Sequence, residues 1–397
     1  MRSSTGQHYL ALDHIRAVAA WLVFVWHFNH GNPAAAPPVP IPQLIPPLGP
    51  SAMLQNSLET WLFVASQSAP GSLAGSPVPF WNAPTFWPAS LLDEGHTGVA
   101  LFMTLSGYLF AKLLAGRSVR FSAFLWNRAL RLLPLLVLVL AIVGAIEVNK
   151  GTASVGEYLA FVAKGLLLPT LPNGAWSITV ELHFYVLLPL LLYASRRSSW
   201  PLVFAVVVVT AMRAGIWLAE GTVQTLAYST LVGRFDQFAF GILALRHRDA
   251  IARHKGLALL GLACFIGAFH WFDANGGYFG ASGYPTSDPS WIALPMLEGL
   301  AYATAIALYD ALAKPVDRGL SGLVGKIGAY SYSIYLLHFF VVFQLGDFAA
   351  QQLGPHAGFW TCTGLATIAF VAMTPIGWLS FRFVESPFLK LRRPYLR

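Results

Sequence analysis

The fold is decided by residues 12–28, which read LDHIRAVAAWLVFVWHF. This run is long and apolar enough to enter a bilayer as a helix, yet it carries Arg16 and His27, eleven positions apart. Eleven steps of about 100° return a helix to nearly the same azimuth, so both side chains share one face, about 16 Å apart along the axis. Because ionisable groups inside a membrane helix are costly, we interpret this face as the wall of a functional site. The alternative is a snorkelling Arg16 and a His27 that only bonds between helices.

The composition is that of a polytopic membrane protein. Of 397 residues, 56% are hydrophobic and only 11% are charged, whereas soluble chains carry about 25% charged residues. The net charge of +8 is therefore expected to lie in basic loops and does not indicate a nucleic-acid partner. The two cysteines, Cys264 and Cys362, fall in apolar runs and suggest neither a disulfide framework nor a metal cluster. An N-terminal signal peptide is the alternative for the first run, but Pro33 and Pro37 crowd its cleavage site.

Apolar runs separated by turn residues predict an all-α protein of about ten transmembrane helices. They are placed at 12–30, 96–115, 131–148, 177–195, 201–219, 228–246, 256–272, 291–312, 329–348 and 358–384. We expect one transmembrane domain over 1–397, without internal repeats or a separate soluble domain.

Loop charge predicts the orientation. With the N-terminus inside, the inner segments hold fifteen Lys and Arg residues, and the outer ones hold only Lys150 and Lys164. These inner segments are 116–130, 196–200, 247–255, 313–328 and the tail after 384. The asymmetry places both termini in the cytoplasm.

The segment 31–95 is a Pro-rich extracytoplasmic insert with 13 of the 26 prolines. Its first part, 33–50, should be extended, because proline excludes helix there. Apolar residues at helical spacing over 54–65 predict a short interfacial helix. The insert is either a rigid lid on the membrane surface or an aromatic platform for an acceptor.

Further polar residues in apolar runs are candidates for the site. Arg128 and Arg131 share a helix face at the inner end of the third span and would bind an anion, or simply mark the cytoplasmic side. Ser177 is a candidate N-cap of the fourth span, and Glu181 lies one turn further with Tyr185 on its face. The remaining candidates are Ser106 in the second span, the intramembrane cations Arg213 and Arg234, and Ser331, Tyr335 and His338, which align on the ninth span. Arg382 and Glu385 would form an i, i+3 ion pair.

Several common catalytic signatures are missing from the sequence. It contains no G-x-S-x-G nucleophile elbow, no H-E-x-x-H zinc helix and no dinucleotide-binding glycine fingerprint. Residues 319–326 resemble a phosphate loop only faintly, since the glycine spacing differs and Ile327 stands where Ser or Thr is required. No metal site and no permanently bound cofactor are therefore expected.

Seven motifs nevertheless occur in one order between Asp13 and Pro387. They are Arg-x10-His, Gly-x-x-x-Phe-x-x-x-Ser-Gly-Tyr-Leu, Arg-x-x-Arg-x-x-Pro, Trp-Ser-x-x-x-Glu-x-x-Phe-Tyr, Gly-Arg-Phe-x-x-Phe-x-x-Gly, Ser-Tyr-Ser-x-Tyr-x-x-His and Glu-Ser-Pro. Together they resemble the acyltransferase 3 family of membrane acyl-CoA-dependent O-acyltransferases, which modify bacterial surface glycans and related acceptors. The chain departs from the family in the insert 31–95 and in Leu182-His183, where the family often has an acidic residue and Gln.

The resemblance implies a multi-pass acyltransferase of a bacterial inner membrane, with acyl-CoA as donor, acetyl by default, and a glycan or other hydroxyl acceptor outside. Arg128 and Arg131, with Arg16 and Arg234 behind them, would hold the nucleotide end of the donor. His27 would be the general base, oriented by Glu181. Direct transfer fits the missing nucleophile signature. The competing class is a secondary transporter or lipid-linked sugar flippase, which would show paired broken helices in two halves. A non-catalytic sensor is a third possibility, against which the intact Arg16, His27 and Glu181 argue.

Overall fold

The computed structural model describes residues 9–30, 84–114, 117–280, 284–353 and 358–396. Within these ranges the chain is helical, and its one β-type pairing is an isolated bridge between Val119 and Leu396. The prediction of an all-α membrane protein is confirmed, because the apolar helices of the described part have the length that a bilayer requires.

Eight helical segments in these ranges are long and apolar enough to span a membrane. They are α1 (Leu10–Asn29), α5 (Gly98–Leu114) with the preceding turn η4 (Gly95–Thr97), α6 (Phe121–Asn149), α8 (Trp176–Ser195), α9 (Trp200–Glu220), α13 (Lys255–Ala274), α14 (Ser290–Leu312) and α18 (Phe359–Ser380), which η7 (Phe381–Glu385) and α19 (Ser386–Leu389) prolong. A bent pair provides a ninth crossing if it is counted as one span: α16 (Ser331–Leu337) with η5 (His338–Phe340), followed by α17 (Val342–Leu353) at 58°.

The segment predicted as span 228–246 forms α10 (Gln224–Ser229) and α11 (Leu231–Arg246). At about 1.5 Å per residue, α11 is roughly 24 Å long, which is shorter than a hydrocarbon core of about 30 Å. The count of ten spans therefore stays a prediction. The other short helices are α7 (Val155–Gly165), α12 (Arg248–Arg253) and α15 (Gly319–Ala329).

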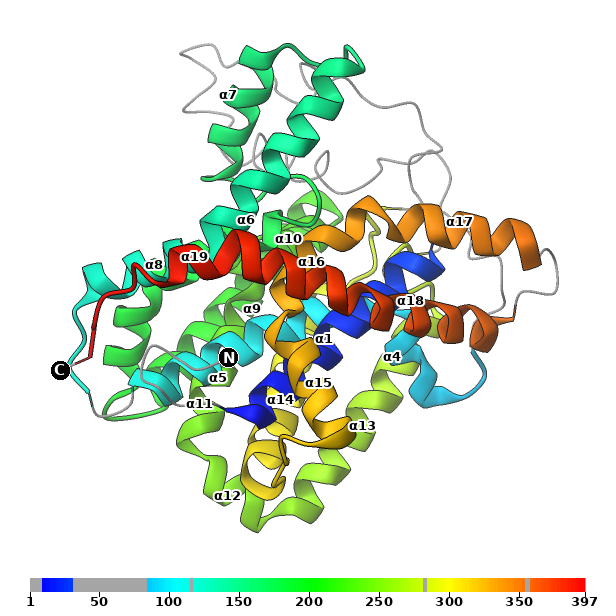
Figure 1. Cartoon of the computed structure of the whole chain (residues 1–397). Coiled ribbons are helices and arrows are strands. Elements are labelled where there is room, and N and C mark those ends of the chain that lie inside the picture. Colours follow the sequence, from blue (N-terminus) through cyan, green and yellow to red (C-terminus); the bar gives the residue numbers. More distant parts are fainter. Residues whose placement is uncertain (1–8, 31–83, 115–116, 281–283, 354–357, 397) are drawn as a thin grey trace.

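Helix α5 lies at the centre of the molecule and α13 at its edge. Of the apolar window that qualifies each helix as a span, 83% is buried in α5 but only 11% in α13. Glycines let the central helices meet backbone to backbone at Gly98 and Gly107. A Cβ on Gly98 would lie 2.5 Å from the Ala19 carbonyl oxygen of α1, and one on Gly107 would overlap the Phe238 carbonyl of α11. In Figure 1, α13 runs along the lower right of the molecule, and α7 with the end of α6 projects at the top.

Two predicted spans differ from the structure. The third begins at Phe121 rather than Arg131, because the basic residues that mark the membrane surface are already helical. The ninth is bent and not straight. The His338 ring takes the Tyr335 carbonyl as a hydrogen-bond partner at 2.6 Å, and a side chain that competes inside the backbone ladder breaks a helix.

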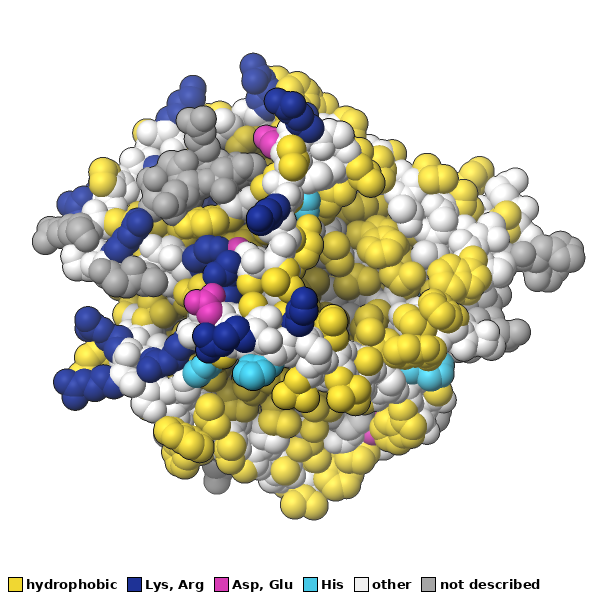
Figure 2. Space-filling model, turned by 90° about the horizontal axis from the view of Figure 1, so that it is seen from below, with side chains coloured by type: hydrophobic (Ala, Val, Ile, Leu, Met, Phe, Trp, Pro, Cys, Tyr) yellow, Lys and Arg dark blue, Asp and Glu magenta, His cyan; other side chains and the backbone are white. Residues whose placement is uncertain are grey.

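Only the end of the predicted insert 31–95 lies within the described residues, since 31–83 fall outside them. The described end forms η3 (Trp87–Ala89) and α4 (Ser90–Asp93), which pack against α13, and α4 also packs against α1. Figure 2 shows the Lys and Arg side chains gathered over the left half of the molecule, whereas the right half is mostly apolar or uncharged.

Candidate functional site

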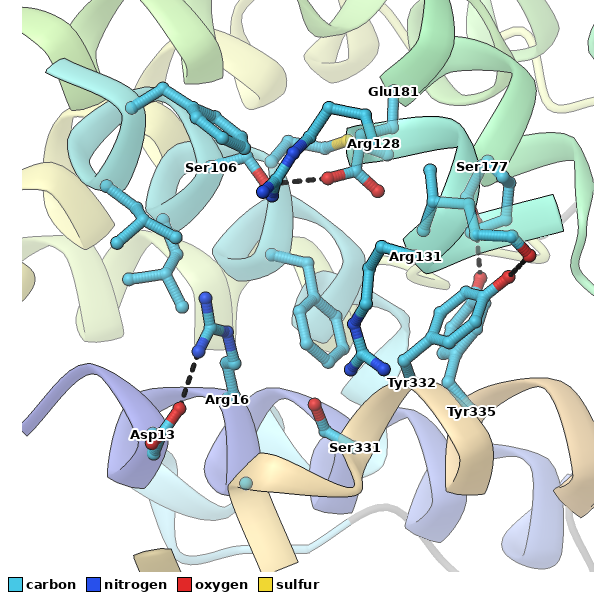
Figure 3. Close-up of a pocket in the computed structure, with 18 of the residues that line it drawn as sticks. Asp13, Arg16, Ser106, Arg128, Arg131, Ser177, Glu181, Ser331, Tyr332 and Tyr335 are labelled. Carbon is cyan, nitrogen blue, oxygen red and sulfur yellow. Dashed lines mark hydrogen bonds and ion pairs between the residues drawn. The ribbon is translucent and has the colours of Figure 1, made fainter. Parts of the chain in front are cut away.

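A cavity of about 200 Å³ lies between α1, α5, α6, α8, α15 and α16. We call it the arginine pocket, because four arginines and only two carboxylates line it. Its polar lining comprises Tyr9, Asp13, Arg16, Ser106, Arg128, Arg131, Ser177, Glu181, Tyr185, Ser331, Tyr332, Tyr335 and Arg392. Figure 3 shows Arg16, Arg128 and Arg131 extending into the same space from three sides. The pocket thus unites eight of the residues that the sequence predicts for the site.

The arginines differ in how far their charge is already neutralised. Arg16 forms an ion pair with Asp13 at 2.5 Å, and Arg131 forms one with the buried Glu385. The guanidinium of Arg128 instead lies over the rings of Phe110 and Phe124, at 5.2 and 5.6 Å. No carboxylate of the described residues forms an ion pair with Arg128, so its charge remains available to an anion.

The Arg131–Glu385 pair replaces an expected one. The sequence predicts that Glu385 pairs with Arg382, three residues before it. The π-helical turn η7 places the two differently: Glu385 points into the protein, where Ser333 also donates to it, and Arg382 lies 5.9 Å from the ring of Trp378. Glu385 therefore connects the end of α18 to α6, instead of pairing with Arg382 in its own helical segment.

Glu181 belongs to the arginine pocket. It accepts hydrogen bonds from Ser106 at 3.2 Å and from Tyr185 in the next helical turn. The expectation that Glu181 orients His27 is corrected here, because the described partners of the carboxylate are these two hydroxyls. The reason is geometric: Glu181 lies one helical turn beyond Ser177 inside the pocket, whereas His27 lies outside the pocket against His338.

Ser177 and Tyr335 form the end of the pocket that faces His27. Their hydroxyls are 2.9 Å apart, and each also donates to the Gly174 carbonyl, Ser177 at 2.9 Å and Tyr335 at 3.1 Å. The predicted N-cap role of Ser177 is wrong, since the N-cap position is Ala175 and Ser177 lies inside α8. The bond from Tyr335 to this carbonyl joins α16 to the start of α8.

His27 and His338 form a pair just outside the pocket. His27 Nδ1 is 2.8 Å from the Val23 carbonyl oxygen and 3.3 Å from His338 Nε2, and His338 Nδ1 is 2.6 Å from the Tyr335 carbonyl. Since a carbonyl only accepts, we assign the proton of each neutral ring to Nδ1. His338 Nε2 then accepts from His27 Nδ1–H. His27 Nε2 is left unprotonated, with no hydrogen-bond partner among the described residues, and can take up a proton.

Arg234 and Arg213 lie away from the arginine pocket. Arg234 donates to the Tyr228 carbonyl at 2.6 Å and is 3.5 Å from Glu298, so the expected place of Arg234 behind Arg128 and Arg131 is corrected. It is near the start of α11, with its guanidinium over the ring of Tyr228, and it does not line the pocket. Arg213 and Asp236 are fully buried and joined by two hydrogen bonds, which is a structural ion pair.

The sequence gives little indication of three further pocket residues. Tyr332 donates to the Leu132 carbonyl at 2.6 Å, and its only signal is its place beside Ser331 in a motif. Tyr9 precedes the first predicted span. Arg392 counts in the sequence only as one more basic residue of the tail, because nothing local shows that the tail returns to α6.

The comparisons with known proteins agree with this architecture. The model of the acyltransferase 3 family, described as an acyltransferase domain, matches residues 9–382. A similar protein is Nodulation protein 10 of Rhizobium leguminosarum bv. viciae, which is 27% identical over 337 residues, covering 77% of this chain and 85% of that protein. No solved structure matches the chain. Since the family match spans nearly all described helices, the chain belongs to the acyltransferase 3 family.

Proposed function

We propose that this acyltransferase moves an acyl group, acetyl by default, from cytoplasmic acyl-CoA to a hydroxyl of an extracytoplasmic glycan or related acceptor. The observation that carries the proposal is a pocket rich in arginine whose far end abuts a histidine with an unprotonated ring nitrogen. The first feature suits a phosphorylated donor, and the second suits a hydroxyl acceptor. We place the protein in a bacterial inner membrane, with both termini in the cytoplasm and one transmembrane domain that extends over the chain.

The donor would enter at the basic side. Guanidinium groups bind phosphate with paired hydrogen bonds, and no carboxylate in the described part of the chain pairs with Arg128, while Arg16 and Arg131 add positive charge around it. The pantetheine arm would then extend through the pocket towards Ser177 and Tyr335. Glu181, Ser106 and Tyr185 would line its path, and Glu181 would hold the two hydroxyls in place.

The chemical step would occur at the far end. His27 Nε2 would take the proton of the acceptor hydroxyl as its oxygen attacks the thioester carbonyl carbon. The new C–O bond forms, the C–S bond breaks, and the leaving thiolate takes the proton from His27 to give free CoA and restore the base. No covalent enzyme intermediate is needed, and CoA stays on the cytoplasmic side while the acyl group leaves on the other.

His27→Gln tests the general base. Glutamine keeps approximate size and hydrogen bonding but takes up no proton, so acyl transfer should fall about a hundredfold or more. Binding of acetyl-CoA should remain, because the base contacts the reacting end and not the phosphates. We would follow transfer of labelled acetyl from acetyl-CoA to endogenous acceptor in membranes, CoA release with a thiol reagent, and acetyl-CoA binding in nanodiscs.

The control is His254→Gln, at an exposed histidine between α12 and α13, which should behave as the unaltered protein. A well-folded His27→Gln protein with near-normal transfer would return His27 to a packing role. An unaltered protein that neither binds acetyl-CoA nor releases CoA would refute the acyl-CoA donor and favour a transporter.

A further inference from the structure

The last described residues, 391–396, form a strap that crosses the start of α6. The buried amide of Asn127 holds it through two hydrogen bonds to one residue: Nδ2 donates to the Arg393 carbonyl at 2.8 Å, and Oδ1 accepts from the Arg393 amide at 2.9 Å. In Figure 1 the strap is the red segment that leads from α19 to the C-terminal end. The family match ends at residue 382, so the strap lies outside the part of the chain that the family model describes.

Further contacts fix the strap on both sides of Asn127. The Arg120 amide donates to the Tyr395 carbonyl at 2.8 Å, and Trp126 Nε1 donates to the Leu391 carbonyl at 3.2 Å. The ring of Tyr395 is buried against Phe124, with centroids 5.7 Å apart. The strap is therefore a built element, since it contributes a side chain to the core and is bonded through its backbone at four residues, Leu391, Arg393, Pro394 and Tyr395.

The strap delivers Arg392 into the arginine pocket, where Arg128 also points. Neither guanidinium forms an ion pair with a carboxylate of the described residues, and the Nε atom of each is buried without a hydrogen-bond partner. Burial, together with the positive charge of Arg128, lowers the pKa of Arg392 to about 10. Two unpaired cations that share a partly buried pocket repel each other until an anion lies between them.

We propose that Arg392 and Arg128 together form the seat for a phosphate group of the donor, and that the strap is a working part of the donor site. This inference rests on the proposed function, because the phosphate is taken to be that of acyl-CoA. Arginine suits this role, since its planar guanidinium binds phosphate oxygens in pairs. Asn127 is a positioning residue, because it holds the backbone that carries Arg392 and does not line the pocket.

The test compares Arg392→Gln with the matched control Arg393→Gln. Arg393 is the next residue of the strap, and its side chain is exposed beside Trp126, outside the pocket. Each variant is assayed with acetyl-CoA and with acetyl-pantetheine, a donor without the nucleotide phosphates. Loss of a charge-assisted bond should raise the KM of Arg392→Gln for acetyl-CoA about tenfold or more, with its KM for acetyl-pantetheine unchanged. Arg393→Gln should match the unaltered protein with both donors.

A KM that rises equally for both donors, or for neither, would overturn the inference; the second result would leave a lipid phosphate as the occupant. A second measurement separates this failure from that of the proposed function. Inorganic pyrophosphate should raise the melting temperature of the purified protein and of Arg393→Gln, but not that of Arg392→Gln. If this pattern holds while acetyl-CoA is neither bound nor used, the phosphate seat stands and the acyl-CoA donor is wrong. Equal stabilisation of all three proteins, or of none, would remove the seat.

Discussion

At the scale of single residues, the contact between His27 and His338 explains how a neutral histidine can present a fixed proton acceptor. The His338 ring is held by the Tyr335 carbonyl and in turn receives the Nδ1–H of His27. His338 thus takes the place that a carboxylate has in a hydrolase triad, but it is uncharged. An uncharged partner suits a site in apolar surroundings, because no second charge has to be desolvated.

His338→Phe and His338→Gln test this role. Phenylalanine keeps an aromatic ring but removes the acceptor, so kcat should fall about tenfold or more while KM for acetyl-CoA stays constant, because the proposed base loses its orientation and donor binding is unaffected. The glutamine carbonyl can still accept from His27 Nδ1, so His338→Gln should recover much of kcat. Steady-state kinetics on both variants, with melting temperatures, provide the measurement. Equal losses for both would mean that His338 serves packing alone.

The sequence allows the polar members of the site to be predicted, because ionisable residues in apolar runs are rare and each requires an explanation. Which of these residues form ion pairs or hydrogen bonds with one another is harder to predict from the sequence. The sequence shows that Arg382 and Glu385 are three residues apart, but it does not show that Glu385 meets Arg131 from the far end of the chain. For the same reason the sequence alone pairs Glu181 with His27, whereas the carboxylate bonds to Ser106 and Tyr185 inside the pocket and His27 lies outside it.

At the scale of helices, the contact between α5 and α11 depends on the absence of side chains at two facing positions. A Cβ on Gly107 would overlap the Phe238 carbonyl, and one on Gly241 would overlap the Thr104 carbonyl. Periodicity predicted these helices well, since the apolar run of α5 and its small residues are continuous. Periodicity did not predict the bend at His338. The bend goes with a hydrogen bond of the His338 side chain to the Tyr335 carbonyl, and the pattern of apolar residues carries no information about such a bond.

Gly107→Ala should therefore destabilise the protein, and Gly267→Ala should not. The first methyl group meets backbone atoms that a side-chain rotation cannot move, and overpacking of this kind costs about 1–3 kcal/mol. Gly267 lies on α13, where an added Cβ meets no atom within 4 Å. Thermal unfolding of both variants in the same detergent gives the comparison, and similar melting temperatures would show that α5 and α11 can move apart without loss.

At the scale of the whole molecule, basic side chains are concentrated on one side, as Figure 2 shows. The proposed orientation follows from this asymmetry, since cytoplasmic loops retain Lys and Arg. It also brings the arginine pocket to the compartment in which acyl-CoA is made. The all-α membrane architecture was accessible from the sequence because hydropathy is summed over many residues, whereas the orientation from loop charge stays a prediction. The exact number of spans was not accessible, because α11 is short and partly polar and still occupies the centre.

Single cysteines test this orientation in a background without Cys264 and Cys362. Lys150→Cys and Arg197→Cys both place a thiol at an exposed loop position, the first after α6 and the second between α8 and α9. In intact cells an impermeant maleimide should label Lys150→Cys and leave Arg197→Cys unlabelled until the membrane is opened. The reverse pattern would invert the topology and place the pocket on the outer side.

The two hydrogen bonds of Asn127 have a consequence for how the tail can evolve. Both bonds are made to the main-chain carbonyl and amide of Arg393, and every residue type except proline has both groups. Selection on the strap should therefore act mainly through Arg392 and the buried Tyr395, while the intervening side chains drift. A saturation library over 391–396 should thus show two intolerant positions in an otherwise permissive run, with proline excluded at 393.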